Sequence, residues 1–268
     1  MIRLAVLGAS VWGPGLAGWQ SLASRAPGAS GASGAPPAPG PVAPPPPAIL
    51  APAERRRSSF VVRLALAAAQ EAAARSGFAP AALRSVFGTS NGDGATVHAI
   101  LDSLTRGDGQ VSPTQFHNSV HNAAPGYWTI GIGTRQPATC LGGHDVTAGT
   151  ALLAAAVEAA VEGAPVLLCV YDAPVPPPLD RVRDTADAFA AALVLAPEGA
   201  GEGGARLSLA VVPEEVPPAA PGANPAAALL PLLVCLAGGT GGEVRIPLLD
   251  GAVAATVDPC SPDRRLPR

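Results

Sequence analysis

Three groups of side chains in this sequence could carry out chemistry. Cys140 follows a short strand-like stretch and precedes a Gly-Gly turn and a long Ala-rich segment, an order typical of a nucleophile at a strand-to-helix turn. His144 and Asp145 stand next to each other in that turn and could act as an acid/base pair. His117 and His121 are four residues apart, so on a helix they would share a face and could bind a metal with Asp145.

Spacing alone gives little support to the histidine groups. Adjacent residues such as His144 and Asp145 rarely point at one another. His117 and His121 lie in a segment that follows a proline and need not be helical, and nothing else in the sequence supports a metal site. We therefore expect hydrogen-bonded, structural histidines, with no metal and no cofactor.

The elements that must position these residues alternate between strands and helices. Apolar and β-branched runs predict strands at 4–10, 83–88, 165–171, 189–197, 205–213, 243–247 and 252–257, of which 189–197 and 205–213 should be antiparallel. Segments rich in residues with high helix propensity predict helices at 60–77, 95–105, 147–163 and 225–237. This alternation predicts an α/β fold, with a mainly parallel mixed sheet flanked by helices.

Composition indicates one domain over residues 1–268. Apolar residues make up 48% of the 268 and charged residues only 14%, so there is enough material for a core. The composition breaks only at 26–52, where Pro, Gly, Ser and Ala predominate; we expect a flexible or polyproline-like loop there.

Charge and hydropathy exclude two classes of partner. The net charge is −3 and no basic stripe carries interleaved aromatics, which argues against nucleic acid. The apolar stretch 226–238 is too short to span a bilayer and contains Pro231. The apolar start at 4–10 lacks a cleavage site and is better explained as a buried strand than as a signal peptide. These features predict a soluble, cytoplasmic protein.

The four cysteines, Cys140, Cys169, Cys235 and Cys260, form no CxxC motif. Mostly apolar surroundings favour buried free thiols over disulfides.

Two further motifs allow a structural and a functional interpretation. The segment GTSNGDG (88–94) lacks the Lys-Ser/Thr of a phosphate-binding loop, which favours a tight turn with glycines at positive φ. Arg55, Arg56 and Arg57 either form a solvated approach to the helix at 60–77 or meet an acidic partner such as an acyl carrier protein.

The segment GQVSPTQFHNSVHNAAPGYWTIGIGTRQPAT (109–139) resembles the central part of β-ketoacyl synthases, the condensing enzymes of fatty acid and polyketide synthesis. Ser112-Pro113, Asn122, Gly126 and Arg135-Gln136-Pro137 fall in register with that pattern. Together with ERRRSS, SNGDG and LLCVYDAP, the segment is similar to β-ketoacyl synthase N-terminal-like proteins, and especially to the chain length factors of aryl polyene pigment clusters. The resemblance implies essentially one half of a thiolase-like fold.

The resemblance also implies that the catalytic residues are missing. Counted from Pro137, the position of the family's catalytic cysteine falls on Asp145, while Cys140 comes too early and within a strand. Asp145 would be a good helix cap and a poor acyl nucleophile, and Cys140 would be buried and inert. The family's catalytic histidines belong to the second half of the fold, and no histidine follows His144. We expect a protein without catalytic activity.

By the same resemblance, the chain pairs with a full-length β-ketoacyl synthase as a heterodimer. Bulk in the segment after Ser112-Pro113 would close the partner's acyl tunnel and limit chain growth. The residues expected at this tunnel and interface are Thr114, Gln115, Phe116, His117, Asn122 and Tyr127, and the Ala-rich helix at 147–163 would be buried by the partner. Two alternatives stay open: a homodimeric module that binds acyl carrier protein through Arg55–Arg57, and an acyl-thioester hydrolase that uses Asp145, or Ser119 with His121.

Overall fold

The computed structural model describes residues 1–26, 40–106, 109–201, 203–214, 216 and 223–259. Its strands are β1 (Ile2–Gly13), β2 (Leu16–Ala17), β3 (Arg84–Gly88), β4 (Ala138–Leu141), β5 (Val166–Asp172), β6 (Phe189–Pro197), β7 (Ala205–Val212), β8 (Gly242–Pro247) and β9 (Ala252–Val257). They form one sheet in the order β4-β3-β5-β6-β1-β7-β9-β8, and β2 pairs with β1.

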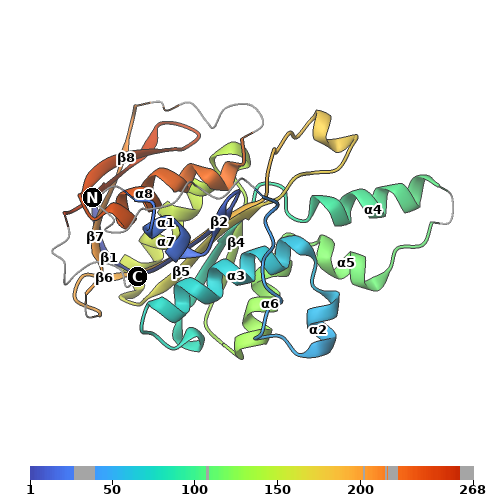
Figure 1. Ribbon diagram of the computed structural model, residues 1–268, viewed down its shortest axis with the longest axis horizontal. Coiled ribbons are helices and arrows are strands. Elements are labelled where there is room, and N and C mark those ends of the chain that lie inside the picture. Colours follow the sequence, from blue (N-terminus) through green and yellow to red (C-terminus); the bar gives the residue numbers. More distant parts are fainter. Residues whose placement is uncertain (27–39, 107–108, 202, 215, 217–222, 260–268) are drawn as a thin grey trace.

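The α-helices lie on the two faces of this sheet and beyond one end of it (Figure 1). They are α1 (Trp19–Ala23), α2 (Pro52–Arg57), α3 (Phe60–Arg75), α4 (Gly94–Thr105), α5 (Pro113–Ser119), α6 (Ala123–Ile132), α7 (Thr147–Glu162) and α8 (Leu230–Gly238). The expected helix at 225–237 is in fact a 3-10 turn, Pro225–Leu229, that continues into α8.

The expected mixed sheet with flanking helices is confirmed, but the expectation that it is mainly parallel is wrong. Only β3 with β4 and β3 with β5 are parallel. The remaining pairs are antiparallel. β6 and β7 were expected to be antiparallel strands; each does pair antiparallel, but with β1, which lies between them, and not with the other.

Alternation along the central strands creates a core on each face. In β5, Val166, Leu168 and Val170 pack in the same cluster as α7 and α8, while Leu167, Cys169 and Tyr171 pack in the same cluster as α3 and α6. This is the two-residue period of a strand that is covered on both faces. Eight of the 16 residues of α7 are buried by its own chain, and its exposed valines, Val157 and Val161, lie on the part that stays uncovered.

α3 packs closely on β1 because both contribute small residues. Ser59 caps the helix by accepting a hydrogen bond from the Val62 amide at 3.4 Å, and ten of its residues are buried, six of them alanines. A Cβ on Gly8 of β1 would lie 2.1 Å from the backbone oxygen of Ala72. The glycine therefore sets how closely helix and sheet approach.

α4 and α5 form a hairpin that stands out at one end of the molecule, beyond β4 (Figure 1). No residue of α4 is buried, and only Asn118 of α5 is. Large apolar side chains are nevertheless present on and next to the hairpin, with exposed fractions of 45% for Leu101, 51% for Leu104 and 67% for Phe116. The chain leaves this apolar surface uncovered.

The segment 26–52 lies only partly within the described residues, since 27–39 fall outside them. Its end contributes to the core, contrary to expectation: Leu50 is buried, and Val42 and Ile49 pack against the same cluster. ERRR belongs to the short helix α2, which precedes α3. No helix among the described residues is long and apolar enough to cross a membrane.

Candidate functional site

The parallel strands β3, β4 and β5 bring their carboxyl ends to the same edge of the sheet. The polar turn Thr89–Gly92 follows β3, the turn Gly142–Val146 follows β4, and Asp172 ends β5. Gly92 has a φ of 59°, a left-handed conformation that favours glycine and confirms the tight turn expected for this segment. This edge is where open α/β sheets commonly place ligand and catalytic groups.

Asp172 is fully buried and organises the turn after β3. Its Oδ1 accepts hydrogen bonds from the Thr89 hydroxyl at 2.8 Å and from the Ser90 and Asn91 amides at 2.9 Å each. Burial raises the pKa of the Asp172 carboxyl to about 6, although these hydrogen bonds and the nearby Arg183 lower it. The carboxyl therefore holds the turn in place and is not free to act on a ligand.

Arg183 connects the turn after β3 to the turn before α7. Its Nε donates to Asn91 Oδ1 at 2.8 Å, Nη2 donates to the Ser90 hydroxyl, and Nη1 forms an ion pair with Asp145 Oδ1. The guanidinium side chain is only 19% exposed. The carboxylate at the expected nucleophile position is therefore neutralised by a cation that two other side chains also hold.

The backbone of this turn is strained at His144. Its φ is 52°, and among the described residues no other non-glycine residue has a positive φ. Its Nδ1 lies 3.2 Å from Asp145 Oδ2, so the adjacent pair does make contact, contrary to expectation. We had expected Asp145 to cap α7, but it does not. Val146 is at the N-cap position, and no side chain makes a capping bond there. The Asp145 carboxylate is instead paired with Arg183.

Cys140 lies within β4, as expected, but it is half-buried and contacts a histidine. His121 Nε2 donates to the Thr89 carbonyl oxygen at 3.0 Å and His121 Nδ1 faces Cys140 Sγ at 3.2 Å, while the Cys140 thiol donates to the His121 carbonyl oxygen at 3.1 Å. The pair resembles a thiol with its base. However, burial raises the pKa of the Cys140 thiol to about 11, which leaves it protonated at neutral pH.

We predict slow modification of Cys140 by thiol reagents. A pKa about two units above the ordinary value of 9.0 lowers the thiolate fraction near pH 8 about a hundredfold. The rate, followed by mass spectrometry, should still be rising at pH 10. A Cys140→Ser variant identifies the signal that belongs to this thiol. A plateau at or below pH 9 would instead show an activated cysteine.

The histidines do not assemble a metal site. His117 stacks edge-on against Tyr127, with ring centroids 5.4 Å apart, while His121 faces Cys140 from beyond the end of α5. No group of three or more potential metal-binding side chains occurs in the part of the chain that the structure describes. The structure does not pair Ser119 with His121: the Ser119 hydroxyl donates to the Phe116 carbonyl oxygen, while the His121 ring lies against Cys140 and Thr89.

The residues expected at a partner's tunnel divide into two groups. Phe116, His117 and Asn122 are exposed, and Thr114 and Gln115 are half-buried, so these five stay candidates for an interface. Tyr127 does not, because it is 1% exposed and its hydroxyl donates to Asn118 Oδ1 at 3.1 Å. It belongs to the core that α6 forms with α3 and the sheet.

The arginine patch is smaller than the sequence indicates. Arg55 is half-buried and donates to the Leu50 carbonyl oxygen at 2.9 Å. Arg56 and Arg57 are exposed, and Arg57 lies 3.4 Å from Glu54, a surface ion pair of little energetic weight. Two arginines are therefore open to an acidic partner.

Sequence reasoning missed Asp172 and Arg183. An acidic residue that ends a wholly apolar strand was a usable signal for Asp172, because such a carboxyl is buried with the strand. Arg183 had no such signal; its partners Asn91 and Asp145 are 92 and 38 residues away in sequence.

Comparison with known proteins agrees with the fold. Among solved structures, the chain is similar to one in a ketosynthase (ApeO) in complex with its chain length factor (ApeC) from Xenorhabdus doucetiae, with 21% identity, a TM-score of 0.69 and coverage of 96% of this chain and 100% of that one. A chain of the ishigamide ketosynthase/chain length factor is 17% identical, with a TM-score of 0.72 and coverage of 96% of this chain and 99% of that one. A chain of AntDE:AntF, a type II polyketide synthase acyl carrier protein in complex with its ketosynthase, is 12% identical. Its TM-score is 0.68, and the match covers 96% of this chain and 98% of that one.

At these identities the similarity establishes the thiolase-like fold alone. No curated protein matches the sequence. The family model for the β-ketoacyl synthase N-terminal domain matches residues 30–230, which is more than half of the chain. The chain therefore belongs to the β-ketoacyl synthase N-terminal domain family.

Proposed function

We propose that the protein is a non-catalytic subunit of the chain length factor type, which pairs with a full-length β-ketoacyl synthase and shapes its acyl tunnel. The observation that carries the proposal is the ion pair of Asp145 and Arg183 at the turn before α7. A condensing enzyme needs an activated thiol at such a turn, where the helix N-terminus stabilises the thiolate. Here the turn presents a neutralised carboxylate, and the thiol of Cys140 lies in β4 with a raised pKa.

The uncovered hairpin of α4 and α5 supports a partner. Phe116 is 67% exposed, Leu101 45% and Leu104 51%, and Val120, which directly follows α5, is 43% exposed. Large apolar side chains gathered on one projecting element are typical of an interface. The similar structures described above are complexes of a ketosynthase with a chain length factor, which favours a ketosynthase as the partner that covers the hairpin.

The test is co-expression with a full-length β-ketoacyl synthase of the polyene or fatty acid type, followed by size-exclusion chromatography and product analysis. The two chains should co-elute, and the length of the product should depend on the presence of this chain. Two charges at the hairpin, in a Leu101→Glu/Phe116→Glu variant, should weaken the complex at least about a hundredfold, because each charge would be buried without a counter-charge.

Val211→Glu is the matched control. Val211 is also exposed, at 57%, but it lies on β7, far along the sheet from the hairpin, and its substitution should leave the complex intact. Separate elution of the two wild-type chains, together with an unchanged product, would refute the proposal. Release of free thiol from acyl-coenzyme A by the purified chain would favour the hydrolase alternative.

A further inference from the structure

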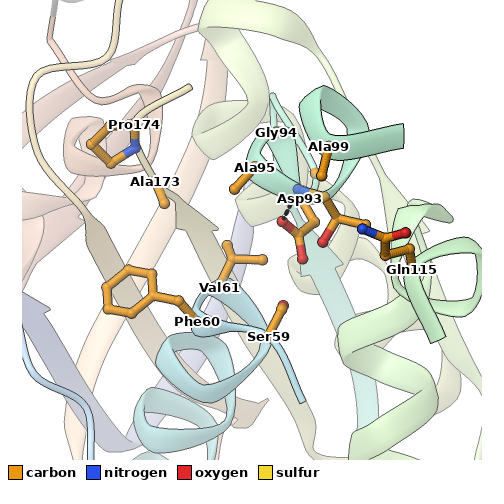
Figure 2. A pocket seen from close by; sticks show the side chains of 12 residues that line it. Ser59, Phe60, Val61, Asp93, Gly94, Ala95, Ala99, Gln115, Ala173 and Pro174 are labelled. Atoms are coloured by element: carbon orange, nitrogen blue, oxygen red, sulfur yellow. Dashed lines mark hydrogen bonds between the residues drawn. The ribbon is translucent and has the colours of Figure 1, made fainter. Parts of the chain in front are cut away.

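A cavity of about 280 Å³ lies where the first turns of α3 and α4 meet (Figure 2). Phe60 and Val61 of α3 form one wall and Ala95 and Ala99 of α4 form another, and Pro174 contributes from the segment after β5. The volume is just below the range usual for small-molecule sites, so the cavity suits a small ligand or the end of a longer one.

Asp93 contributes to this cavity a buried carboxylate with one oxygen that lacks a hydrogen-bond partner among the described residues. The residue lines the cavity and is 6% exposed. Its Oδ1 caps α4 by accepting from the Thr96 amide at 3.0 Å. Its Oδ2 is buried, and no hydrogen-bond partner for it occurs among the described residues. Buried carboxylate oxygens normally have such partners, so this one lacks a donor that a ligand can supply.

We propose that this cavity binds a ligand that joins a hydrogen-bond donor, an ammonium or hydroxyl group, to a small apolar body. The donor pairs with Asp93 Oδ2, and the apolar body packs against Phe60, Val61 and Ala99. Anionic ligands are excluded, because a second negative charge next to the Asp93 carboxylate would be buried without a counter-charge. This inference concerns the isolated chain and goes beyond the proposed function.

The test titrates the full chain with benzylamine, toluene and benzoate, followed by ligand-observed NMR. Benzylamine, protonated at neutral pH, should bind at least tenfold more tightly than toluene, which has the same apolar body without a donor, and benzoate should not bind. Equal binding of benzylamine and toluene, or binding of benzoate, would overturn the role of Asp93. Failure of benzylamine to bind at millimolar concentration would overturn the site itself.

Two variants separate the carboxylate from the cavity. Asp93→Asn keeps an oxygen on the Thr96 amide, so the cap survives, but it places an amide nitrogen where Oδ2 was. Benzylamine affinity should then fall to that of toluene. Ala99→Phe fills the cavity and should abolish binding of both, whereas Asp102→Asn, on the same helix and paired with Arg106, should change neither. Unchanged benzylamine binding by Asp93→Asn or Ala99→Phe would refute the site.

Two sources could supply such a ligand: a free small molecule, or the far end of an acyl chain that carries a terminal hydroxyl group and is held by a partner ketosynthase. Ala99→Phe in the co-expressed complex distinguishes them. A shortened product identifies the acyl chain, and an unchanged product, with benzylamine binding lost in the isolated chain, identifies a free molecule. Because the binding measurement needs no partner, failure of the proposed heterodimer would leave its outcome unaffected.

Discussion

Replacing Asp172 by Ala is expected to lower the free energy of unfolding by about 3 kcal/mol at neutral pH. The substitution leaves the buried Thr89 hydroxyl and the amides of the half-buried Ser90 and Asn91 without their acceptor. Chemical denaturation of the purified chain measures the effect. A change below about 1 kcal/mol would mean that the turn after β3 does not depend on this carboxyl.

The same residue predicts a pH dependence with a definite sign. Because the native pKa of about 6 lies above the ordinary 3.8, the folded state holds the proton more tightly than the unfolded state does. Stability should therefore fall as the pH rises from about 4 to 6, by up to about 3 kcal/mol, and stay level above that. Asp172→Asn keeps one acceptor oxygen and cannot titrate, so the difference between wild type and this variant isolates the effect. A constant difference across this pH range would contradict the raised pKa.

Gly8→Ala is the second substitution with a large expected effect. The new methyl group would lie 2.1 Å from the Ala72 oxygen and 3.1 Å from the Ser76 nitrogen. Both are backbone atoms, the first in the last turns of α3 and the second in its C-cap residue. Backbone atoms cannot change rotamer as a side chain can, so α3 must shift away from β1. We expect a loss of about 3 kcal/mol in the free energy of unfolding, measured by thermal or chemical denaturation.

Gly126→Ala provides the control for Gly8→Ala. Gly126 lies inside α6, and a Cβ there would meet no heavy atom within 4 Å. Its replacement should raise stability by about 0.5 to 1 kcal/mol, because alanine loses less backbone entropy than glycine in a helix. Equal effects of the two substitutions would show that close packing of α3 on β1 is not what requires glycine at position 8.

The elements of the fold were largely predictable because their patterns are local. Ser59 and Gly77 mark the ends of α3 to within two residues, and the apolar run of β5 was identified almost to its bounds. The direction of the strands was less accessible. Alternating strands and helices suggest parallel pairing, yet β1 inserts between β6 and β7 and makes both neighbours antiparallel, a long-range arrangement that no local pattern reveals.

The site was predictable only in its position along the chain. Residue spacing placed Asp145 at the turn before the Ala-rich helix, where the structure also has it. What neutralises it, Arg183, comes from a loop whose sequence has no periodicity. Tyr127 was misassigned for a similar reason: α6 carries apolar residues on most faces, so its sequence does not indicate which of them turn inward.

The position of β4 at one end of the sheet has a consequence for assembly. Among the described strands it pairs only with β3, so its outer side presents backbone N–H and C=O groups that no strand satisfies. With a length of four residues it is too short to be an efficient template for uncontrolled aggregation. It is long enough to hydrogen-bond a complementary strand, and a neighbouring molecule that joined it there would continue the sheet from one polypeptide into the next.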